Sequence, residues 1–293
     1  MILSIGEILA DMIGDETESG LCFSAFCGGA PFNVAVNAKQ AGAKVGFIGR
    51  VGRDPIGKFL LDFSRKAEFD YLDIQTDEVR NTTLAFVTLT NGERDFAFFR
   101  HETADFNMNE SEINLEKYDG LHIVHLGSLM LSEERGRSFA KEIVRKVRAA
   151  KKKLSFDVNF RMDLYGSLAD AIAAYQPFVD EADILKFSED EITAYTGKEN
   201  LDEAIAAMSR KDRLLLVTLG SEGSMYVYNG ETGIVPTSKV TPVDTTGAGD
   251  AFFGTVLAML DGKEFTKENI EFALKKGNEA GAKATQFKGA IKL

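Results

Sequence analysis

The residues best suited to chemistry in this sequence are the nine in Asp244–Phe252, which read Asp-Thr-Thr-Gly-Ala-Gly-Asp-Ala-Phe. They lead into the apolar run Ala251–Leu260, which predicts a helix. The first turn of a helix has unpaired backbone N–H groups and carries about half a positive charge, so it attracts phosphate. Gly247 and Gly249 let this backbone approach a ligand closely. Because Asp250 would lie beside the bound anion, where a carboxylate can accept the proton of an attacking hydroxyl, the pattern predicts phosphoryl transfer to an alcohol.

A plain helix cap is the alternative explanation of this segment, because glycine-rich turns followed by Asp are common at helix starts. Two glycines, two threonines and two aspartates within seven residues are more than a cap requires, so ligand binding is favoured. No Gly-Lys-Ser/Thr follows the glycines, and the segment is therefore not a Walker-type loop.

The composition is that of a globular enzyme. With 293 residues, 44% of them hydrophobic and 27% charged, the chain is long enough to bury the core of one large α/β domain. It contains no run of about 18 apolar residues, so no segment is expected to span a membrane. The start, Met1–Glu7, lacks a basic region and a cleavage site and predicts a first strand. We therefore expect a cytoplasmic protein.

Charge and cysteine content narrow the classes of partner and site. The net charge of −11 argues against nucleic-acid binding, which relies on basic patches. Cys22 and Cys27 have no His nearby, a pattern that predicts free thiols rather than a metal site or a disulfide framework. The histidines, His101, His122 and His125, show no Ser-His-Asp order, so we expect them to serve strand packing or lid contacts and not catalysis.

The order of predicted elements is that of a doubly wound α/β fold. The apolar, β-rich runs expected to form strands are Ile2–Ile5, Lys44–Ile48, Leu121–Leu126, Leu154–Asp157, Ile184–Phe187 and Leu214–Leu219. Several are separated by amphipathic stretches of helix length, of which Glu133–Lys151 is the clearest. Such repetition predicts right-handed crossovers and a mainly parallel sheet flanked by helices. Ligands bind such sheets at the carboxyl ends of the strands.

Two stretches break this rhythm and predict a small antiparallel β lid. Residues 82–90 alternate and run into Asn91-Gly92, a favoured hairpin turn, before residues 94–100. Residues 11–23 are expected to join them. Since no long linker, internal repeat or low-complexity tract is present, residues 1–293 are predicted to form a single domain with a lid built from about 11–23 and 82–100.

Four polar side chains outside Asp244–Phe252 are candidates for ligand contacts. Asp11, at a predicted strand end, can accept two hydrogen bonds from a diol, although a turn-forming Asp fits equally well. Asn33, in the first turn of a helix predicted at 32–43, can donate to and accept from hydroxyls, and a capping Asn is the alternative. Arg100 and Arg161 offer fixed, permanently charged donors suited to phosphate, although most arginines are solvated surface charges.

Taken together, the motifs resemble the ribokinase-like (PfkB) family of carbohydrate kinases, and among them the bacterial fructokinases. Asp244–Phe252 resembles the C-terminal family signature Asp-Thr-x-Gly-Ala-Gly-Asp-x-Phe, and Ala30-Pro31 resembles the fructokinase form of the N-terminal Gly-Gly element. The other segments that resemble family motifs, in family order, are Gly6–Asp11, Cys27–Ala35, Gly46–Lys58, Phe156–Arg161, Lys186–Glu189 and Thr218–Gly223. The resemblance covers nearly the whole chain and implies a ribokinase-like fold with a β lid.

The resemblance also implies roles on the sugar side of the site. Asp250 would be the catalytic base, and the amides of Gly247, Ala248 and Gly249 would form the anion hole. The substrate-binding residues would be Asp11, Gly28, Gly29, Asn33, Arg100 and Arg161.

On the nucleotide side, the resemblance implies contacts from Lys186, Thr218, Gly220, Gly223 and Asn278. Lys186 replaces the Asn of the family's Asn-x-x-Glu motif. Glu189 would organise Mg²⁺ through water, and a helix-start charge pattern is the alternative for this residue. A loop near the C-terminus would bind a monovalent cation such as K⁺ through Asp244, Thr246, Ala284, Phe287 and Gly289.

The function that follows is that of an ATP-dependent sugar kinase, with fructose as the first choice of acceptor and fructose 6-phosphate as product. Alternative acceptors are 2-keto-3-deoxygluconate, ribose or a nucleoside, because the sugar pocket lies in the variable lid. A non-catalytic sugar- or nucleotide-binding protein is the alternative from another class, and the intact Asp250 argues against it. An exposed edge hairpin in the lid predicts a homodimer, with neither nucleic acid nor membrane as a partner.

Overall fold

The computed structural model describes residues 1–18, 20–90 and 93–293. The predicted Asn91-Gly92 turn lies outside the described residues. The strands are β1 Ile2–Ile5, β2 Leu9–Thr17, β3 Gly20–Gly28, β4 Val45–Gly52, β5 Tyr71–Asp77, β6 Leu84–Thr90, β7 Glu93–Phe99, β8 Ile123–Leu126, β9 Lys153–Asp157, β10 Ile184–Ser188, β11 Leu214–Thr218, β12 Ser224–Tyr228 and β13 Glu231–Val235. The α-helices are α1 Ala30–Gln40, α2 Pro55–Arg65, α3 Glu134–Ala149, α4 Leu168–Glu181, α5 Glu189–Thr196, α6 Leu201–Met208, α7 Ala248–Leu260 and α8 Lys267–Ala284.

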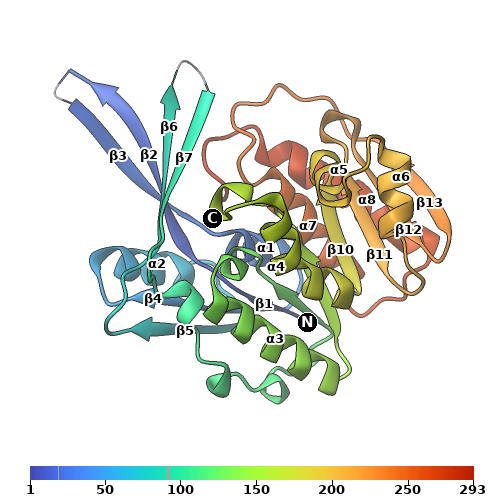
Figure 1. The fold of residues 1–293 in the computed structure, drawn as a ribbon, viewed down its shortest axis with the longest axis horizontal. Helices are drawn as coiled ribbons and strands as arrows, with labels where there is room; N and C mark the ends of the chain where they lie inside the picture. Colours follow the sequence, from blue (N-terminus) through green and yellow to red (C-terminus); the bar gives the residue numbers. More distant parts are fainter. Residues whose placement is uncertain (19, 91–92) are drawn as a thin grey trace.

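A nine-stranded sheet in the order β13-β12-β11-β10-β9-β8-β1-β4-β5 forms the centre of the molecule (Figure 1). Pairing is parallel from β5 to β11 and antiparallel at β12 and β13. The predicted mainly parallel sheet is confirmed. The antiparallel edge was not predicted, and it arises because only the short turn Leu219–Gly223 joins β11 to β12, which leaves no room for a crossover helix.

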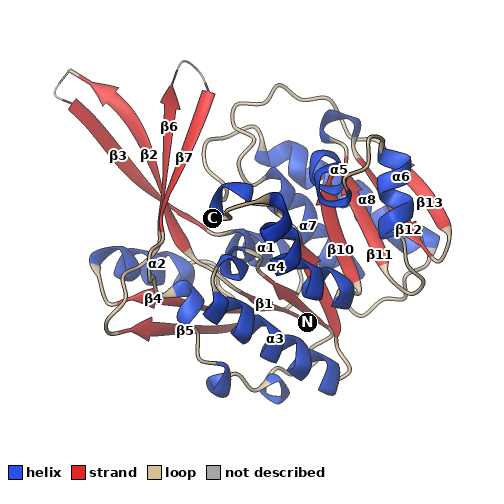
Figure 2. Cartoon of the chain, in the orientation of Figure 1, coloured by secondary structure: helices blue, strands red, loops and turns tan. Residues whose placement is uncertain are grey.

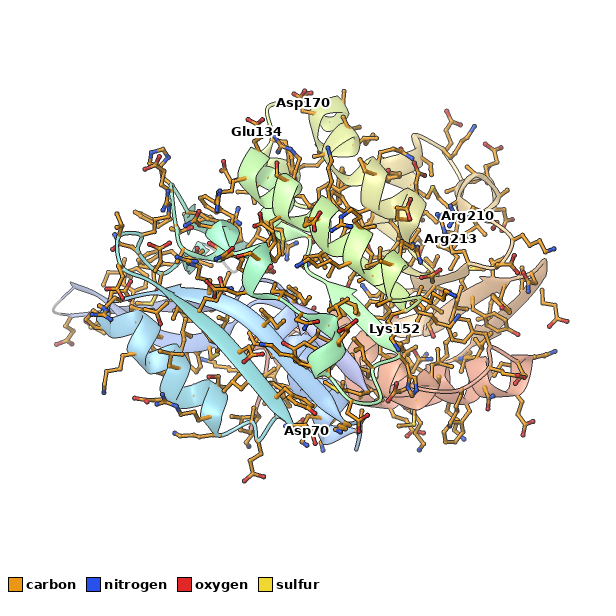
Figure 3. All side chains as sticks on the ribbon, turned by 90° about the horizontal axis from the view of Figure 1, so that it is seen from below. Asp70, Glu134, Lys152, Asp170, Arg210 and Arg213 are labelled. Atoms are coloured by element: carbon orange, nitrogen blue, oxygen red, sulfur yellow. The ribbon has the colours of Figure 1, made fainter. Side chains whose placement is uncertain are left out.

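Helices cover both faces of this sheet (Figure 2). Alternate residues of each strand belong to different hydrophobic cores: Leu185 packs with helices α3 to α6, whereas Ile184 packs with α1, α7 and α8. Strands buried on both faces read as continuous apolar runs, which is why the sequence reveals them. Charged residues such as Glu134 and Asp170 project from the periphery (Figure 3). The result is a three-layer arrangement with the strand ends free to build a site.

A second sheet, in the order β3-β2-β6-β7, rises from one side of the core as a lid (Figure 1). It consists of two antiparallel hairpins, β2–β3 and β6–β7, joined by parallel pairing of β2 with β6. The strands extend past the predicted bounds, since β2 begins at Leu9 and β3 continues to Gly28. These extensions run directly into the core, so the root of the lid lies beside the carboxyl end of β1.

Candidate active site

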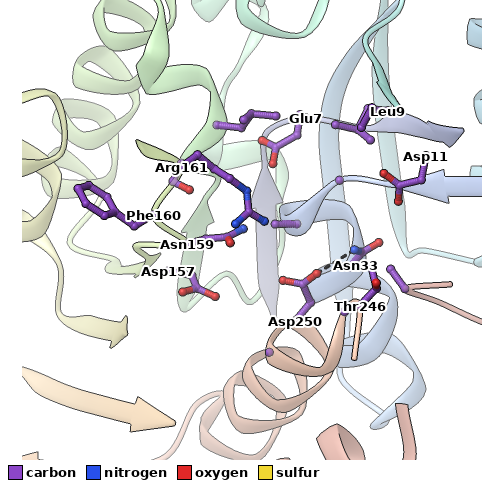
Figure 4. A pocket seen from close by; sticks show the side chains of 18 of the residues that line it. Glu7, Leu9, Asp11, Asn33, Asp157, Asn159, Phe160, Arg161, Thr246 and Asp250 are labelled. Atoms are coloured by element: carbon purple, nitrogen blue, oxygen red, sulfur yellow. Dashed lines mark hydrogen bonds between the residues drawn. The ribbon is translucent and has the colours of Figure 1, made fainter. Parts of the chain in front are cut away.

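A cavity of about 640 Å³ lies between the lid and the carboxyl ends of the central strands. It contains most of the residues predicted for the sugar side and the anion hole (Figure 4). The predicted residues that line it are Asp11, Gly29, Asn33, Arg161, Lys186, Thr246, Gly247, Gly249 and Asp250. The fold therefore brings together side chains that are more than 200 positions apart in the sequence.

The N-terminus of helix α7 opens onto this cavity. Gly247 is the residue before the helix and has a φ of 76°, in the left-handed region that glycine favours. A Cβ at this position would lie 2.5 Å from the carbonyl oxygen of Ala290, so no other residue fits without displacing the backbone. No side chain caps the helix. The N–H of Ala248 donates to the carbonyl oxygen of Thr245 at 3.3 Å, whereas Gly247 and Gly249 line the cavity directly. Binding of an anion at this helix start stays a prediction.

Asp250 lies in the first turn of α7 and accepts a hydrogen bond from Asn33 Nδ2 at 2.8 Å. Burial raises the pKa of Asp250 to about 7, with a further upward contribution from Asp157, while the Asn33 hydrogen bond and the charges of Lys186 and Arg161 act in the opposite direction. A carboxylate that titrates close to neutral pH is well suited to accept a proton from a hydroxyl.

Lys186, in the middle of β10, lies near the same helix start. Its Nζ would be 3.6 Å from a Cβ on Gly249, and it donates to both carboxylate oxygens of Asp157 at 2.9 Å. Burial opposes the charge of Lys186, but Asp157, Glu191 and Asp250 together raise its pKa above the usual value. The ammonium group therefore stays charged and adds to the positive potential of the helix N-terminus.

The loop after β9 presents Arg161 to the cavity (Figure 4). The backbone N–H of Phe160 donates to Glu191 Oε1 at 2.9 Å, and that of Val158 donates to the carbonyl oxygen of Lys186 at 3.1 Å. These two bonds tie the loop to β10 and to the start of α5. Arg161 thereby faces the cavity that Asp250 also lines.

Asp11 and the Gly28-Gly29 pair form the lid side of the cavity. Burial raises the pKa of Asp11 to about 6, opposed by Arg161 and reinforced by Asp244. A Cβ on Gly28 would lie 2.2 Å from Asp11 Oδ2, and one on Gly29 would lie 2.5 Å from the carbonyl oxygen of Glu7. Of the two glycines only Gly29 lines the cavity. Because glycine has no side chain, these two positions leave room for Asp11 and for the β1–β2 turn. The spacing of the glycines in the sequence did not reveal this role.

Arg100 does not reach this cavity. Its Nε and Nη2 donate to Asp105 at 3.1 and 2.8 Å, and Nη1 donates to Ser132 Oγ. It lines a neighbouring space of about 600 Å³ at the root of the lid. Because the buried carboxylate of Asp105 takes up the guanidinium donors, the structure does not bring Arg100 to the predicted sugar contact.

A second cavity, of about 590 Å³, meets the first at the start of α7. The two cavities share Thr245 and Gly249. The residues predicted for the nucleotide that line this second cavity are Thr218, Gly220, Gly223 and Asn278. The Asn278 side chain donates to the carbonyl oxygen of Val235 at 2.8 Å, so its amide also fixes the wall of the cavity. This arrangement places two cavities of similar volume on either side of the start of α7.

The residues predicted for a monovalent cation lie close together. Asp244 Oδ1 accepts from the N–H of Thr246 at 2.8 Å, and Oδ2 accepts from the N–H of Gly289 at 3.1 Å. The backbone N–H of Asp244 donates to the carbonyl oxygen of Thr285, just after α8 ends at Ala284. The Asp244 carboxylate thus connects the segment before α7 to the loop after α8 that contains Phe287, and a potassium ion at this place stays a prediction.

Glu189 is the first residue of α5 and is exposed. It lines neither cavity. Its neighbour Glu191 instead completes a capping box with Ser188. Among the described residues, no cluster of three or more His, Cys, Asp or Glu side chains is arranged to hold a metal ion.

His125, in β8, is buried. Burial lowers its pKa to about 3, with a smaller contribution from Lys186, and its ring packs edge-on against Phe253. A neutral, packed imidazole agrees with the expectation of a strand-packing role.

Within the described chain, none of the helices has both the length and the apolar character needed to cross a lipid bilayer.

Two carboxyl groups that line the first cavity were not predicted as site residues: Glu7 and Asp157. Both follow or end a buried strand, and this position at the carboxyl edge of the sheet was the available signal. The charged groups that shift the pKa values of Glu7 and Asp157 come from distant segments of the chain. The spacing of residues in the sequence therefore could not predict the charge of either carboxyl group.

Comparison with known proteins agrees with this geometry. Residues 1–293 match the pfkB family of carbohydrate kinases. The chain is 37% identical over 301 residues to fructokinase-2 of Oryza sativa subsp. japonica, covering 99% of this chain and 90% of that protein. Fructokinase from Vibrio cholerae O395, solved with fructose, ADP and calcium ion, superposes with a TM-score of 0.87 at 30% identity, covering 99% of this chain and 94% of that one.

A further solved structure with the same fold has a different acceptor. Aminoimidazole riboside kinase from Salmonella enterica, complexed with aminoimidazole riboside and an ATP analog, has a TM-score of 0.86 at 25% identity, covering 99% of this chain and 94% of that one. Full-length matches in sequence and in structure agree with a helix start that lies between two cavities. This chain belongs to the pfkB family of carbohydrate kinases.

Proposed function

We propose that this chain transfers the γ-phosphoryl group of ATP to the primary hydroxyl of fructose and releases fructose 6-phosphate. The observation that carries the proposal is the place of Asp250: a buried carboxyl group whose pKa is raised to about 7, at the open start of α7 where the two cavities meet. Relatives named fructokinases, matched over nearly the full chain, favour fructose as the acceptor.

In the proposed mechanism, Asp250 accepts the proton of the attacking hydroxyl while the oxygen attacks the γ-phosphorus in line with the leaving ADP. The amides of Gly247, Ala248 and Gly249 donate to the phosphoryl oxygens on which negative charge develops. Lys186 and Arg161, which line the same cavity as Asp250, add positive charge near the transferred phosphoryl group. The lid strands cover the sugar and limit the access of water that would otherwise hydrolyse ATP.

Magnesium and potassium are the ions that we expect in this site. Glu189, at the start of α5 and outside both cavities, would hold Mg²⁺ only through intervening water, and the ion would neutralise charge on the nucleotide phosphates. K⁺ would be held by Asp244, Thr246 and carbonyls of the loop from Ala284 to Gly289. Since the reaction consumes ATP, we expect the cytoplasm as its location.

A coupled ADP-release assay over a panel of sugars tests the proposed function. We expect ADP release that depends on both ATP and fructose. Release with 2-keto-3-deoxygluconate, ribose or a nucleoside but without a response to fructose would reassign the acceptor, and the likeness to aminoimidazole riboside kinase makes a nucleoside the second candidate. No release with any acceptor would indicate a binding protein.

The Asn33–Asp250 hydrogen bond leads to a prediction about pH dependence. Asn33→Ala removes a donor that lowers the pKa of Asp250. A hydrogen bond to a charged group contributes about 1.5–3 kcal/mol, so we expect the acid limb of the kcat/KM profile to move upward by about one pH unit or more. Asn37→Ala is the matched control, since Asn37 donates to a backbone carbonyl one turn along α1. An unmoved acid limb in Asn33→Ala would show that this bond does not set the pKa of the base.

The outer face of the lid suggests a homodimer. Side chains alternate across a sheet, so Phe98 faces the cavity while Phe99 points outward and is 63% exposed. Phe86 contacts both Phe23 and Phe99, with ring centroids 4.8 Å apart in each pair, and joins them into one aromatic row. A lid face of this kind is a site for pairing between two subunits.

Light scattering tests the dimer. We expect a dimer mass for the wild-type chain and a monomer mass for Phe99→Asp, because a carboxylate in an apolar interface is costly to bury. Phe272→Asp provides the control, since Phe272 is 47% exposed on α8, away from the lid. A wild-type monomer at assay concentration would refute the prediction.

A further inference from the structure

Glu7 is a buried carboxyl group that the proposed mechanism does not use. It follows β1, lines the sugar-side cavity and is 2% exposed. Its carboxyl group points toward the space that Arg161 and Asp250 also face (Figure 4). No described residue offers a hydrogen bond to its Oε2. A buried polar atom without a protein partner is completed by an ordered water or by a ligand.

The surroundings of Glu7 favour its uncharged form. Oε2 lies against the backbone at Gly127, where an added Cβ would be 2.8 Å away, and the apolar side chains of Leu9 and Leu129 line the same cavity. Burial raises the pKa of Glu7 to about 8, a hydrogen bond from its own backbone opposes this, and the charge of Asp105 adds to the increase.

The neighbouring Asp105 shows the opposite behaviour. It accepts from the hydroxyls of Thr83 and Thr103 at 2.6 and 2.8 Å, in addition to its ion pair with Arg100. Burial alone would raise the pKa of Asp105, but these partners keep it below the usual value. Two buried carboxyl groups thus divide their roles: the partnered one holds the negative charge, and Glu7 holds a proton.

Other charged groups around Glu7 also affect its pKa, some raising it and others lowering it. Asp250, on α7, raises the pKa of Glu7, and Arg100, after β7, lowers it. Asp11 from β2 and Arg161 from the loop after β9 face the same cavity with opposite charges. The segments beside Gly127 and at the start of α1 contribute no titratable side chain to the cavity.

We propose that Glu7 is a specificity-determining residue that donates a hydrogen bond from its protonated carboxyl group to an oxygen of the acceptor sugar, an inference that rests on the proposed function. Asp11, with a lower pKa, is charged at neutral pH and accepts from sugar hydroxyls across the cavity. One donor and one acceptor in the same cavity match a neutral polyol. Ionised Glu7 would instead lack a proton to donate and would add negative charge near Asp250.

The experiment compares Glu7→Gln, which keeps an uncharged donor of similar shape, with Glu7→Met, which keeps the length and removes the donor. With fructose as the probe at pH 7, we expect the KM for fructose to stay within about threefold in Glu7→Gln and to rise about tenfold or more in Glu7→Met. The KM for ATP should not change in either variant. We also expect the wild-type KM for fructose to rise above about pH 8, and this rise to be absent in Glu7→Gln.

Three results would overturn the proposal: a wild-type KM in Glu7→Met, equal losses in both variants, or a wild-type KM for fructose that stays level to pH 9. A purely structural role would lower the Tm of both variants without removing the alkaline rise in one of them.

Carboxyl ¹³C NMR of the labelled, full-length protein separates a failure of this inference from a failure of the proposed function. We expect one Glu resonance that titrates above pH 7, moves when fructose is added and disappears in Glu7→Gln. If no sugar supports ADP release but this resonance is present and moves with fructose, the catalytic function fails while the role of Glu7 stands. If the resonance is absent or ignores fructose, the role of Glu7 is refuted whatever the turnover.

Discussion

Asp250→Asn is expected to lower kcat by about two to four orders of magnitude and to leave ATP binding nearly unchanged, because the amide cannot accept the proton of the sugar hydroxyl. The substitution is expected to disturb the structure of the site very little. The substituted group is buried and close in shape to the original, and a neutral amide is readily accommodated where the carboxyl group itself titrates at about 7. Steady-state turnover together with calorimetric titration of ATP provides the measurement.

The matched control is Asp202→Asn. Asp202 also lies in the first turn of a helix, α6, but it is exposed and lines neither cavity. Its replacement should leave kcat within about twofold, as for most surface changes. Near-normal turnover in Asp250→Asn would show that another group accepts the proton.

Lys186→Met is expected to produce the second large effect, on stability and turnover together. Lys186 and Asp157 are each 5% exposed and are joined by two hydrogen bonds of 2.9 Å. Removing one partner of a buried pair leaves an uncompensated charge, which costs about 3–5 kcal/mol. Turnover should fall by about two orders of magnitude, since the anion hole loses its nearest ammonium group. Chemical denaturation and the ADP-release assay measure the two effects separately.

The double variant Lys186→Met/Asp157→Asn separates the two roles of the lysine. Without a charge on either residue, most of the lost stability should return, because replacing a buried pair by neutral groups is often close to neutral in free energy. Turnover should stay low, because the charge facing the phosphate is still missing. If the double variant regained turnover, Lys186 would act only as the counter-charge of Asp157.

The start of α7 could be predicted from the sequence because the determinants are local. The structure shows a left-handed glycine at Gly247, a helix that follows it, and a carboxylate three positions later, all within one turn. The conformation of each depends on neighbouring residues. The parallel strands could be predicted for a similar reason, since a strand buried on both faces is a continuous apolar run.

Several features of the site could not be predicted in this way. Arg100 has the residue type of a sugar contact, but a buried Asp105 takes its donors. Glu189 fits a family motif by spacing, and yet it is exposed while its neighbour Glu191 forms the capping contacts. For Arg100 the competing acceptor, Asp105, is held in place by the Thr83 hydroxyl, 22 positions away, whereas the capping box of Ser188 and Glu191 is local to the start of α5.

The sequence alone therefore determined the class of chemistry: an anion-binding helix start with a carboxylate beside it, at the carboxyl edge of a parallel sheet. Only the tertiary structure decided the protonation and pairing of the groups around it. Burial raises the pKa of Asp250 to about 7 and that of Glu7 to about 8, and Lys186 finds Asp157 across 29 positions. Desolvation and long-range charge pairing depend on which segments pack together, whereas the conformation of a single turn is encoded in adjacent residues.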